Sequence, residues 1–124
     1  MIDHLGITCT DLQASGRFYD AVLGVLGHRR LMYVGIAIGY GTDTPDFWIS
    51  VGEAATGPDG EVHVAFTAPD ADAVRRFHAT AVELGAESLH EPRLWPEYHA
   101  AYFGGFVRDP DGNNVEAVCH RGEG

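Results

Sequence analysis

The sequence predicts an α+β protein made of two similar halves, each of which begins with a strand followed by a helix. Residues 2–27, IDHLGITCTDLQASGRFYDAVLGVLG, align with residues 61–86, EVHVAFTAPDADAVRRFHATAVELGA, at an offset of 59. Runs rich in β-branched and aromatic residues follow each helix and predict further strands. Because a half of about 55 residues buries too little surface to be stable alone, we expect the two halves to pair.

The first half begins with a predicted strand over residues 2–8, in which every second side chain, including that of His4, falls on one face. Thr10 or Asp11 is a suitable helix N-cap. Apolar residues recur at three- and four-residue spacing over residues 12–26, which predicts an amphipathic helix. After the helix, RRLMYVGIAIGY and DFWISVG predict strands separated by the turn-like segment GTDTP.

The second half repeats this order. A predicted strand places His63 where the first half has His4, Asp70 opens a helix, and Gly85 ends it. The segments AAYFGGFVRD and NNVEAVCH then predict two strands on either side of the turn DPDG. We therefore expect a first module at residues 1–52, a polar Gly/Pro linker at residues 53–60 and a second module at residues 61–124.

Composition and charge exclude several classes of protein. The chain has 124 residues, a formal net charge of −10 and 45% hydrophobic residues, as in an ordinary globular protein. The negative charge argues against nucleic acid and anionic membrane surfaces as partners. The absence of a signal-peptide pattern and the presence of only two cysteines, Cys9 and Cys119, lead us to expect a cytoplasmic protein.

Two histidines and one carboxylate are candidate metal ligands. His4 and His63, each of which alone also fits an ordinary strand position, are equivalent in the repeat and would face a shared concavity if the halves are related by a pseudo-twofold axis. A divalent metal is the commonest partner of converging imidazoles. Glu116 lies among apolar residues, where a carboxylate is costly unless it is paired, bound to metal or at a wet edge. Such a triad suits Fe, Mn, Zn, Ni or Co.

Three segments carry a family resemblance: IDHLGI, EVHVAFTAPD and FVRDPDGNNVEAV. Together they resemble the vicinal oxygen chelate superfamily, which includes glyoxalases, bleomycin-resistance proteins and extradiol dioxygenases. The resemblance extends from His4 to Cys119. It implies two βαβββ modules that pair into a cupped, barrel-like mixed sheet with the helices outside. It also implies a divalent metal ion held by His4, His63 and Glu116.

Two positions depart from the pattern of that family. Glyoxalase I-like members have a fourth ligand, Glu or Gln, where this chain has Trp48 or, in a shifted register, Ser50, so we expect Trp48 to be a pocket wall. Extradiol dioxygenases have an acid/base tyrosine where this chain has Phe106. The resemblance implies a metal-dependent lyase, isomerase or ring-cleaving dioxygenase whose small substrate chelates the metal through adjacent oxygens. The alternative is a non-enzymatic binder of an aromatic antibiotic, in which the histidines are structural.

The longest irregular stretch expected in the second half is residues 88–105, SLHEPRLWPEYHAAYFGG, which the resemblance places beside the pocket. Within it, His99 and Tyr102 are the candidate general acid or base residues, because both types transfer protons when their pKa is perturbed. The alternative is that these aromatic residues pack at a dimer interface. His120 is expected to be structural. Since cupped sheets leave strand edges and apolar rims uncovered, we also expect a homodimer.

Overall fold

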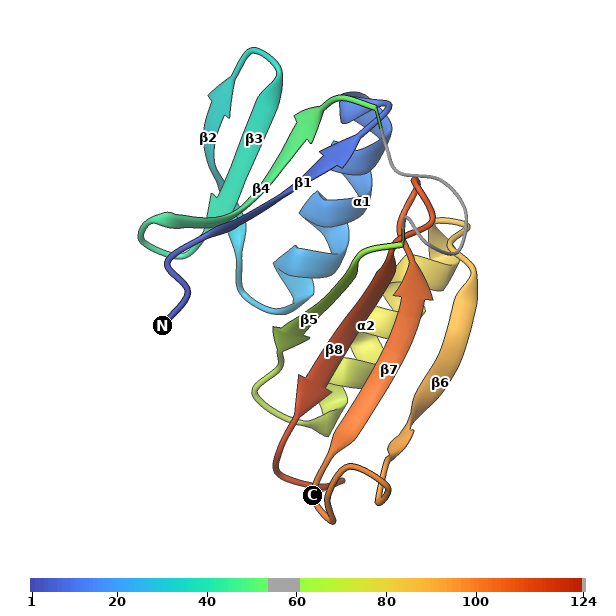
Figure 1. Ribbon diagram of the computed structural model, residues 1–124. Helices are drawn as coiled ribbons and strands as arrows, with labels where there is room; N and C mark the ends of the chain where they lie inside the picture. The colour runs from blue at the N-terminus through green and yellow to red at the C-terminus, as the bar shows by residue number, and fades with distance from the viewer. Residues whose placement is uncertain (54–60, 124) are drawn as a thin grey trace.

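The computed structural model describes residues 1–53 and 61–123, which form two modules of one sheet and one helix each (Figure 1). In the first module the sheet has the strand order β1-β4-β3-β2, with β1 and β4 parallel and the other pairs antiparallel. Its elements are β1 (Leu5–Cys9), α1 (Leu12–Val25), β2 (Arg29–Val34), β3 (Ala37–Gly41) and β4 (Pro45–Val51).

The second module repeats this topology. Its sheet has the order β5-β8-β7-β6, again with one parallel pair, β5 and β8. Its elements are β5 (His63–Thr67), α2 (Ala71–Glu83), β6 (Ser88–Leu94), β7 (Phe103–Arg108) and β8 (Asn114–Cys119). The prediction of an α+β fold with two βαβββ modules is confirmed. Residues 54–60 of the expected linker lie outside the described residues.

The duplicated sequence folds into duplicated local structure. Asp11 is the N-cap of α1 and accepts hydrogen bonds from the backbone N–H groups of Gln13 and Ala14. Asp70 is the N-cap of α2 and accepts one from Ala73. Each helix is followed by a glycine in the left-handed region, Gly27 at φ 90° and Gly85 at φ 93°. A residue with a Cβ is strained there, so the two helices stop within one residue of the same point of the repeat.

One expectation about local structure is wrong. Residues 88–94 were expected to be irregular, but they form strand β6, which pairs with β7 at the edge of the second sheet. Its pairing register shifts twice, between Ser88 and His90 and between His90 and Arg93. Pro92 lies inside this bulged edge strand, where the lack of a backbone N–H is tolerated. Bulges and a proline hide the two-residue alternation by which a strand is recognised in sequence.

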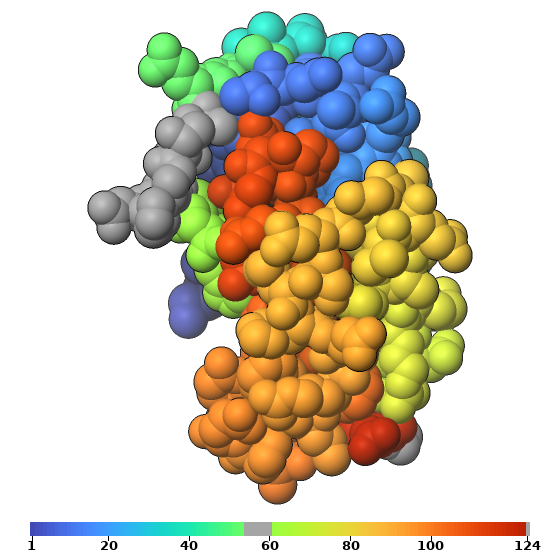
Figure 2. Space-filling view, turned by 90° about the vertical axis from the view of Figure 1, so that its right-hand side faces the viewer, coloured from blue at the N-terminus to red at the C-terminus, as the bar shows by residue number. Residues whose placement is uncertain are grey.

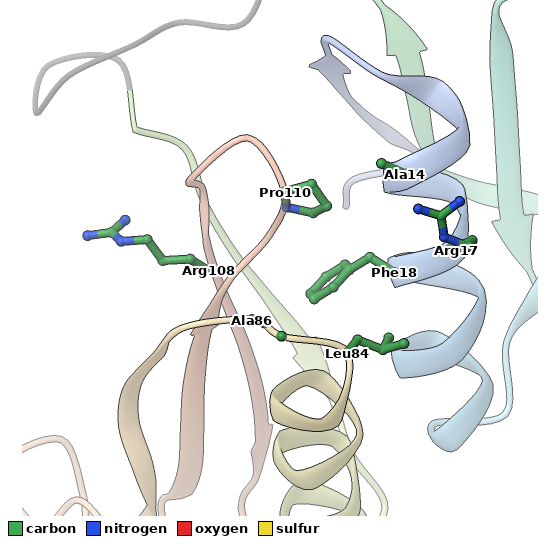
Figure 3. A pocket seen from close by; sticks show the side chains of 8 residues that line it. Ala14, Arg17, Phe18, Leu84, Ala86, Arg108 and Pro110 are labelled. Atoms are coloured by element: carbon green, nitrogen blue, oxygen red, sulfur yellow. The ribbon is translucent and has the colours of Figure 1, made fainter.

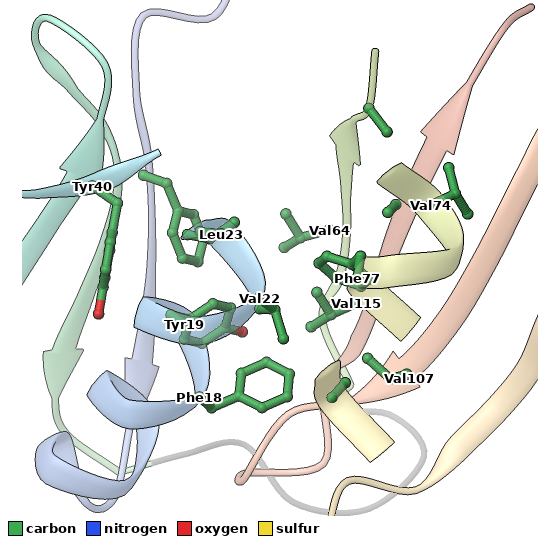
Figure 4. Packing of buried hydrophobic residues seen from close by; sticks show 14 of the residues in the cluster. Phe18, Tyr19, Val22, Leu23, Tyr40, Val64, Val74, Phe77, Val107 and Val115 are labelled. Atoms are coloured by element: carbon green, nitrogen blue, oxygen red, sulfur yellow. The ribbon is translucent and has the colours of Figure 1, made fainter. Parts of the chain in front are cut away.

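The hydrophobic core is continuous between the modules because α1 packs toward both of them. In Figure 4, Phe18 and Val22 of α1 face Val64 and Phe77 of the second module, while Tyr40 lies on the other side of α1. Aromatic contact also crosses directly between the sheets, since the rings of Phe47 and Phe66 meet edge to face at 5.0 Å. The chain is therefore a single packed unit.

The turn between β7 and β8 joins the modules through hydrogen bonds. Asp111 accepts from the backbone N–H of Thr10 at 3.1 Å and from its hydroxyl at 2.7 Å. Asp109, which is buried, accepts from the hydroxyl of Tyr19 at 2.7 Å. Figure 2 shows this turn, in orange-red, against the blue residues of the first module. These bonds hold the two modules in one relative orientation.

Each sheet has one face that its helix leaves uncovered, which we call the open face. On β1, Ile7 and Cys9 are buried beneath α1, whereas Gly6 and Thr8 are exposed. On β5, Val64 is buried and His63, Ala65 and Thr67 are exposed. In Figure 1 both helices lie behind their sheets, so the open faces point to the same side of the chain. Of the helices described, none combines the length and apolar character needed to cross a membrane.

Candidate functional site

A pocket of about 310 Å³ lies on the open face of the second sheet. Strands β5, β7 and β8 form its floor, and the segment between β6 and β7 forms its wall. It brings together all four predicted site residues of the second module. The pocket is lined by His63, Tyr98, His99, Tyr102, Phe106, Glu116 and His120. A carboxylate, three imidazoles and two phenols thus share one concave surface.

His63 and Glu116 meet at the floor of this pocket. The Nε2 atom of His63 lies 3.0 Å from Oε1 of Glu116. The Glu116 side chain is 2% exposed, whereas that of His63 is 48% exposed. Two ligand atoms that are each about 2.1 Å from one metal ion and at right angles lie about 3.0 Å apart. The spacing and chemistry of the two side chains therefore fit two adjacent positions of a divalent metal.

Tyr102 holds the other oxygen of the same carboxylate. Its hydroxyl donates a hydrogen bond to Oε2 of Glu116, so that Oε1 remains directed at His63. Burial, and then the hydrogen bond to Glu116, raises the pKa of Tyr102 above its ordinary value. The phenol accordingly stays protonated at neutral pH and acts as a donor toward the carboxylate. Such hydrogen bonds orient metal-binding carboxylates.

His99 and His120 form a second pair in the pocket. Nε2 of His99 lies 2.8 Å from Nδ1 of His120, and the backbone N–H of Ala101 donates to Nδ1 of His99 at 3.1 Å. Both rings meet the Tyr102 ring edge to face, at centroid distances of 5.5 Å and 5.4 Å. We expected His120 to be structural, and its pairing with His99 was not predicted. The separation of 21 residues from His99 follows no known motif, so the pairing becomes visible only in the fold.

Aromatic residues line the pocket floor and the surface beside it. Phe106 lies nearly parallel to the His63 ring at 6.0 Å and meets Trp95 edge to face at 5.2 Å. The Trp95 indole is buried and donates its N–H to the carbonyl of Gly104. Arg93 lies over the Trp95 ring, 3.4 Å from its centroid. This packing fixes the position of Phe106, which presents an apolar surface to the pocket.

His4 is not part of this pocket. It lies just before β1, with its side chain 61% exposed and its Nδ1 atom 2.7 Å from Asp3. Within the described part of the chain, no three His, Cys, Asp or Glu side chains are placed to hold one metal ion. One chain thus assembles two of the three predicted ligands and leaves the third on the first sheet.

Trp48 lies on the open face of the first sheet. It pairs with Gly6 of β1 on one side and with Gly39 of β3 on the other. Its indole rests on Gly39, because a Cβ added to that glycine would lie 2.9 Å from two atoms of the indole. The indole therefore lies against Gly39 on the open face of the first sheet, and β1, the strand that pairs with β4 there, begins just after His4.

A smaller cavity of about 230 Å³ separates α1 from the second module. Arg17 and Phe18 line it on the α1 side, and Leu84 and Pro110 on the other (Figure 3). Arg108 points away from α1 in this view and donates to Glu61 and to the carbonyl of Gly112. The side chains that line this smaller cavity do not converge as those of the first pocket do. The His63–Glu116 pocket is therefore the better candidate site.

Comparison with known proteins agrees with the fold. Residues 1–117 match the family model of the Glyoxalase/Bleomycin resistance protein/Dioxygenase superfamily. A search of curated proteins finds no match. A glyoxalase/bleomycin resistance protein from Albidiferax ferrireducens T118 has a similar structure, with a TM-score of 0.83 and 28% identity over 94% of this chain and 97% of that chain.

Two further structures share the fold at lower identity. Lactoylglutathione lyase from Agrobacterium tumefaciens is 21% identical with a TM-score of 0.71, over 96% of this chain and 92% of that one. Fosfomycin resistance protein FosX from Mesorhizobium loti is 20% identical with a TM-score of 0.72, over 96% and 91%. With a family model that spans nearly the whole chain and a structure of the same duplicated topology, the protein belongs to the glyoxalase/bleomycin resistance protein/dioxygenase superfamily.

Proposed function

We propose that the protein is a metal-dependent enzyme whose site is shared between two copies of the chain. His63 and Glu116 of one subunit and His4 of the partner subunit would hold a divalent ion, Fe, Mn, Zn, Ni or Co. The observation that carries this proposal is the 3.0 Å spacing of His63 Nε2 and Glu116 Oε1 at the floor of a pocket. The place of His4 on the other module then calls for a second copy.

The surface of the first module supports a homodimer. Eight large apolar side chains are more than 40% exposed there: Met1, Ile2, Leu5, Met32, Tyr33, Val34, Ile36 and Val51. The hydrogen bonds of Asp109 and Asp111 to α1 and its N-terminal end keep a chain from folding its two open faces together. A twofold axis that brings the first sheet of one copy over the second sheet of the other covers both faces and creates two equivalent sites.

The residues of this chain have separable tasks in the proposed site. His63 and Glu116 bind the metal, and Tyr102 orients Glu116 through its hydroxyl. Phe106 and the covering Trp48 of the partner subunit exclude water and favour a planar substrate. When bound, the metal supplies Lewis-acid stabilisation of charge on two adjacent substrate oxygens.

The charge of the pocket restricts the substrate. None of the seven lining residues is Lys or Arg, and the chain contains no lysine. Arg93, on the adjacent strand β6, is held over the Trp95 ring and donates to Glu97 at 3.2 Å. Burial of an anionic substituent needs a cationic partner. We therefore expect a small substrate that carries no charge beyond the pair of oxygens on the metal.

Two positions favour lyase or isomerase chemistry. Phe106 has no proton to give, so the pocket lacks the tyrosine that the resemblance would require there for ring cleavage. Trp48 supplies no lone pair, because its ring nitrogen only donates. The site therefore has three protein ligands, and open positions remain for a bidentate substrate. The reaction favoured is that of a lyase or isomerase distinct from glyoxalase I, with ring-cleaving dioxygenation as the other branch.

Metal analysis tests the proposal directly. The purified protein should contain about one metal ion per chain after loading and dialysis, and His4→Ala, His63→Ala and Glu116→Ala should each lose most of it. Normal metal content in one variant would remove that residue from the site. A wild-type protein that takes up no stoichiometric metal would instead favour the non-enzymatic antibiotic binder.

Mixing two inactive variants tests whether the site is shared. A heterodimer of His4→Ala and Glu116→Ala chains has one site that lacks both ligands and one that is intact. Unfolding and refolding the two variants together should therefore restore metal binding to about half of the sites in the heterodimers. A mixture that binds no more metal than the separate variants would show that each site is formed within one chain. Mixing His63→Ala with Glu116→Ala is the control, because both changes affect the same half-site.

A further inference from the structure

The His99–His120 pair has a defined hydrogen-bond direction. A backbone N–H can only donate, so the bond from Ala101 requires a lone pair on Nδ1 of His99. Neutral His99 must then carry its proton on Nε2, the atom that lies 2.8 Å from Nδ1 of His120. It follows that His99 donates and that Nδ1 of His120 accepts.

The same logic fixes the tautomer of His120. Because its Nδ1 atom accepts, neutral His120 carries its proton on Nε2. In the described residues, the only hydrogen bond of the His120 ring is the one to His99. Adding a proton to either ring breaks the bond from Ala101 or the bond between the rings. With both imidazoles neutral, the pair therefore presents one N–H group, that on Nε2 of His120.

We propose that His120 is a neutral hydrogen-bond donor of the pocket, which stabilises negative charge on a substrate oxygen, and that His99 is the positioning residue that keeps it in the donor tautomer. This role rests on the proposed function for the identity of the ligand. A fixed donor that faces developing negative charge stabilises the transition state. It is also the device this pocket needs, since its lining contains no Lys or Arg.

The geometry assigns His120 the role of donor and excludes that of a general base. A base needs a lone pair directed at the proton that it removes. In the proposed tautomer, the lone pair of His120 is on Nδ1 and already accepts the proton of His99. His99 likewise has its lone pair engaged by Ala101. Neither imidazole of the pair has a lone pair free for the substrate.

Nitrogen NMR of the metal-free, full-length protein tests the tautomers without any substrate. With ¹⁵N-labelled histidine, at slightly alkaline pH, His99 and His120 should both show a proton on Nε2 and an unprotonated Nδ1. The variants His99→Asn and His120→Asn assign the signals. His78→Gln is the control, because His78 bonds Ser88 on the far side of the sheet and its removal should leave the pair unchanged. A proton on Nδ1 of either His99 or His120 would overturn the proposal.

Two substitutions at one position test the donor role. The amide nitrogen of Gln can take the place of Nε2, whereas the shorter Asn reaches only the place of Nδ1. With zinc-loaded protein and acetohydroxamate as a planar, anionic two-oxygen probe, His120→Asn should weaken binding by about 10- to 100-fold. His120→Gln should stay within about threefold of wild type. Equal weakening, or none, in both variants would refute the donor role.

The NMR and probe-binding experiments distinguish a failure of this inference from a failure of the proposed function. A protein that binds no zinc refutes the shared metal site, while the nitrogen signals still report the histidine pair. A protein that binds zinc normally but has His120 protonated on Nδ1 refutes only the donor.

Discussion

Trp48 holds in the first sheet the position that Glu116 holds in the second. Trp48 pairs with Gly6 of β1, and Glu116 pairs with Ala65 of β5, at the point that the sequence repeat makes equivalent to Gly6. In each module, the residue that pairs with this side chain follows a histidine by two positions. That histidine is His4 in the first module and His63 in the second. The repeat therefore creates two equivalent positions, and this chain has a carboxylate at only one of them.

Replacing Trp48 with Glu should add a metal ligand. The new carboxylate would lie beside His4 as Glu116 lies beside His63, so we expect the divalent metal to bind at least tenfold more tightly. Competition with a chromophoric chelator measures this affinity. Trp48→Phe is the control, since it removes the indole without supplying a ligand and should leave the affinity near that of wild type. An affinity that is unchanged in Trp48→Glu would separate this position from the metal.

The contact between Trp48 and Gly39 predicts a coupled pair. Gly39→Ala places a Cβ 2.9 Å from the indole and 2.9 Å from Pro45. We expect it to lower the free energy of unfolding by about 1–3 kcal/mol because of overpacking. The loss should be smaller in a Trp48→Ala background, where the indole is gone. Urea unfolding of the four proteins of this cycle measures the coupling, and strictly additive effects would place the indole elsewhere.

Removing the hydroxyl of Tyr102 should weaken metal binding without abolishing it. Tyr102→Phe leaves Oε2 of Glu116 without its donor, so the carboxylate is free to turn away from His63. Loss of such an orienting bond costs about 10- to 100-fold in metal affinity. Tyr98→Phe, in the same pocket but without a bond to Glu116, serves as the matched control. Full metal affinity in Tyr102→Phe would show that Glu116 needs no support.

A charge on the exposed hairpin should dissociate the proposed dimer. Ile36, at the tip between β2 and β3, is 65% exposed in one chain, and Val82 on the outer helix α2 is 44% exposed. We expect Ile36→Glu to shift the protein from dimer to monomer and to lose metal, while Val82→Glu does neither. Sedimentation at tens of micromolar gives the assembly state. A wild-type monomer at that concentration would contradict the shared site.

Two buried tyrosines predict a loss of stability at alkaline pH. Burial, followed by the charge of Asp109, raises the pKa of Tyr19, and burial, followed by the hydrogen bond to Asp20, raises that of Tyr40. The unfolded phenol titrates at about pH 10. Their stabilisation is therefore complete below that pH and is lost as the pH rises toward the higher folded values. The free energy of unfolding should fall by up to about 1.4 kcal/mol per pH unit for each tyrosine.

Phenylalanine variants check this slope. Tyr19→Phe should cost about 1.5–3 kcal/mol at pH 8, because the buried carboxylate of Asp109 loses its hydroxyl donor and keeps only those from Asp111 and Asn113, but its alkaline slope should be shallower. Tyr98→Phe changes an exposed ring and should keep the wild-type slope. Urea unfolding between pH 8 and 11, at fixed protein concentration, makes the comparison. Parallel slopes in wild type and Tyr19→Phe would show that Tyr19 titrates normally.

The repeat made much of the fold predictable from sequence. The capping residues Asp11 and Asp70 and the terminal glycines Gly27 and Gly85 carry local signals, and the structure has the caps at the same point of both modules and the glycines within one residue of it. Strand β6 was not predicted, because a bulged edge strand that contains Pro92 has no regular alternation of apolar and polar residues. Regular alternation of apolar and polar residues indicates a strand, and an irregular edge strand lacks this alternation.

The site was predictable only in part. Some of the proposed ligands carry local signals in the sequence, whereas other pocket residues are far apart in the chain and only the fold brings them together. The strand position of His63 and the apolar surroundings of Glu116 are local features, and the fold brings these two side chains together. The partner of His120 is His99, from which it is separated by strands β7 and β8 and the turn between them, and no spacing rule links the two residues. The place of His4 depends on how the modules are oriented, which tertiary packing decides.

The hydrogen bonds of the DPDG turn also bear on how the chain is made. Thr10 and Tyr19 lie 101 and 90 residues before their acceptors, Asp111 and Asp109. During synthesis the amino-terminal half leaves the ribosome long before these carboxylates exist, at roughly 5–20 residues per second. Its first helix must wait several seconds with an unpaired tyrosine and an uncovered apolar side. Completion of the fold is thus delayed until the DPDG turn has left the ribosome, and until then the apolar side of the first helix stays uncovered.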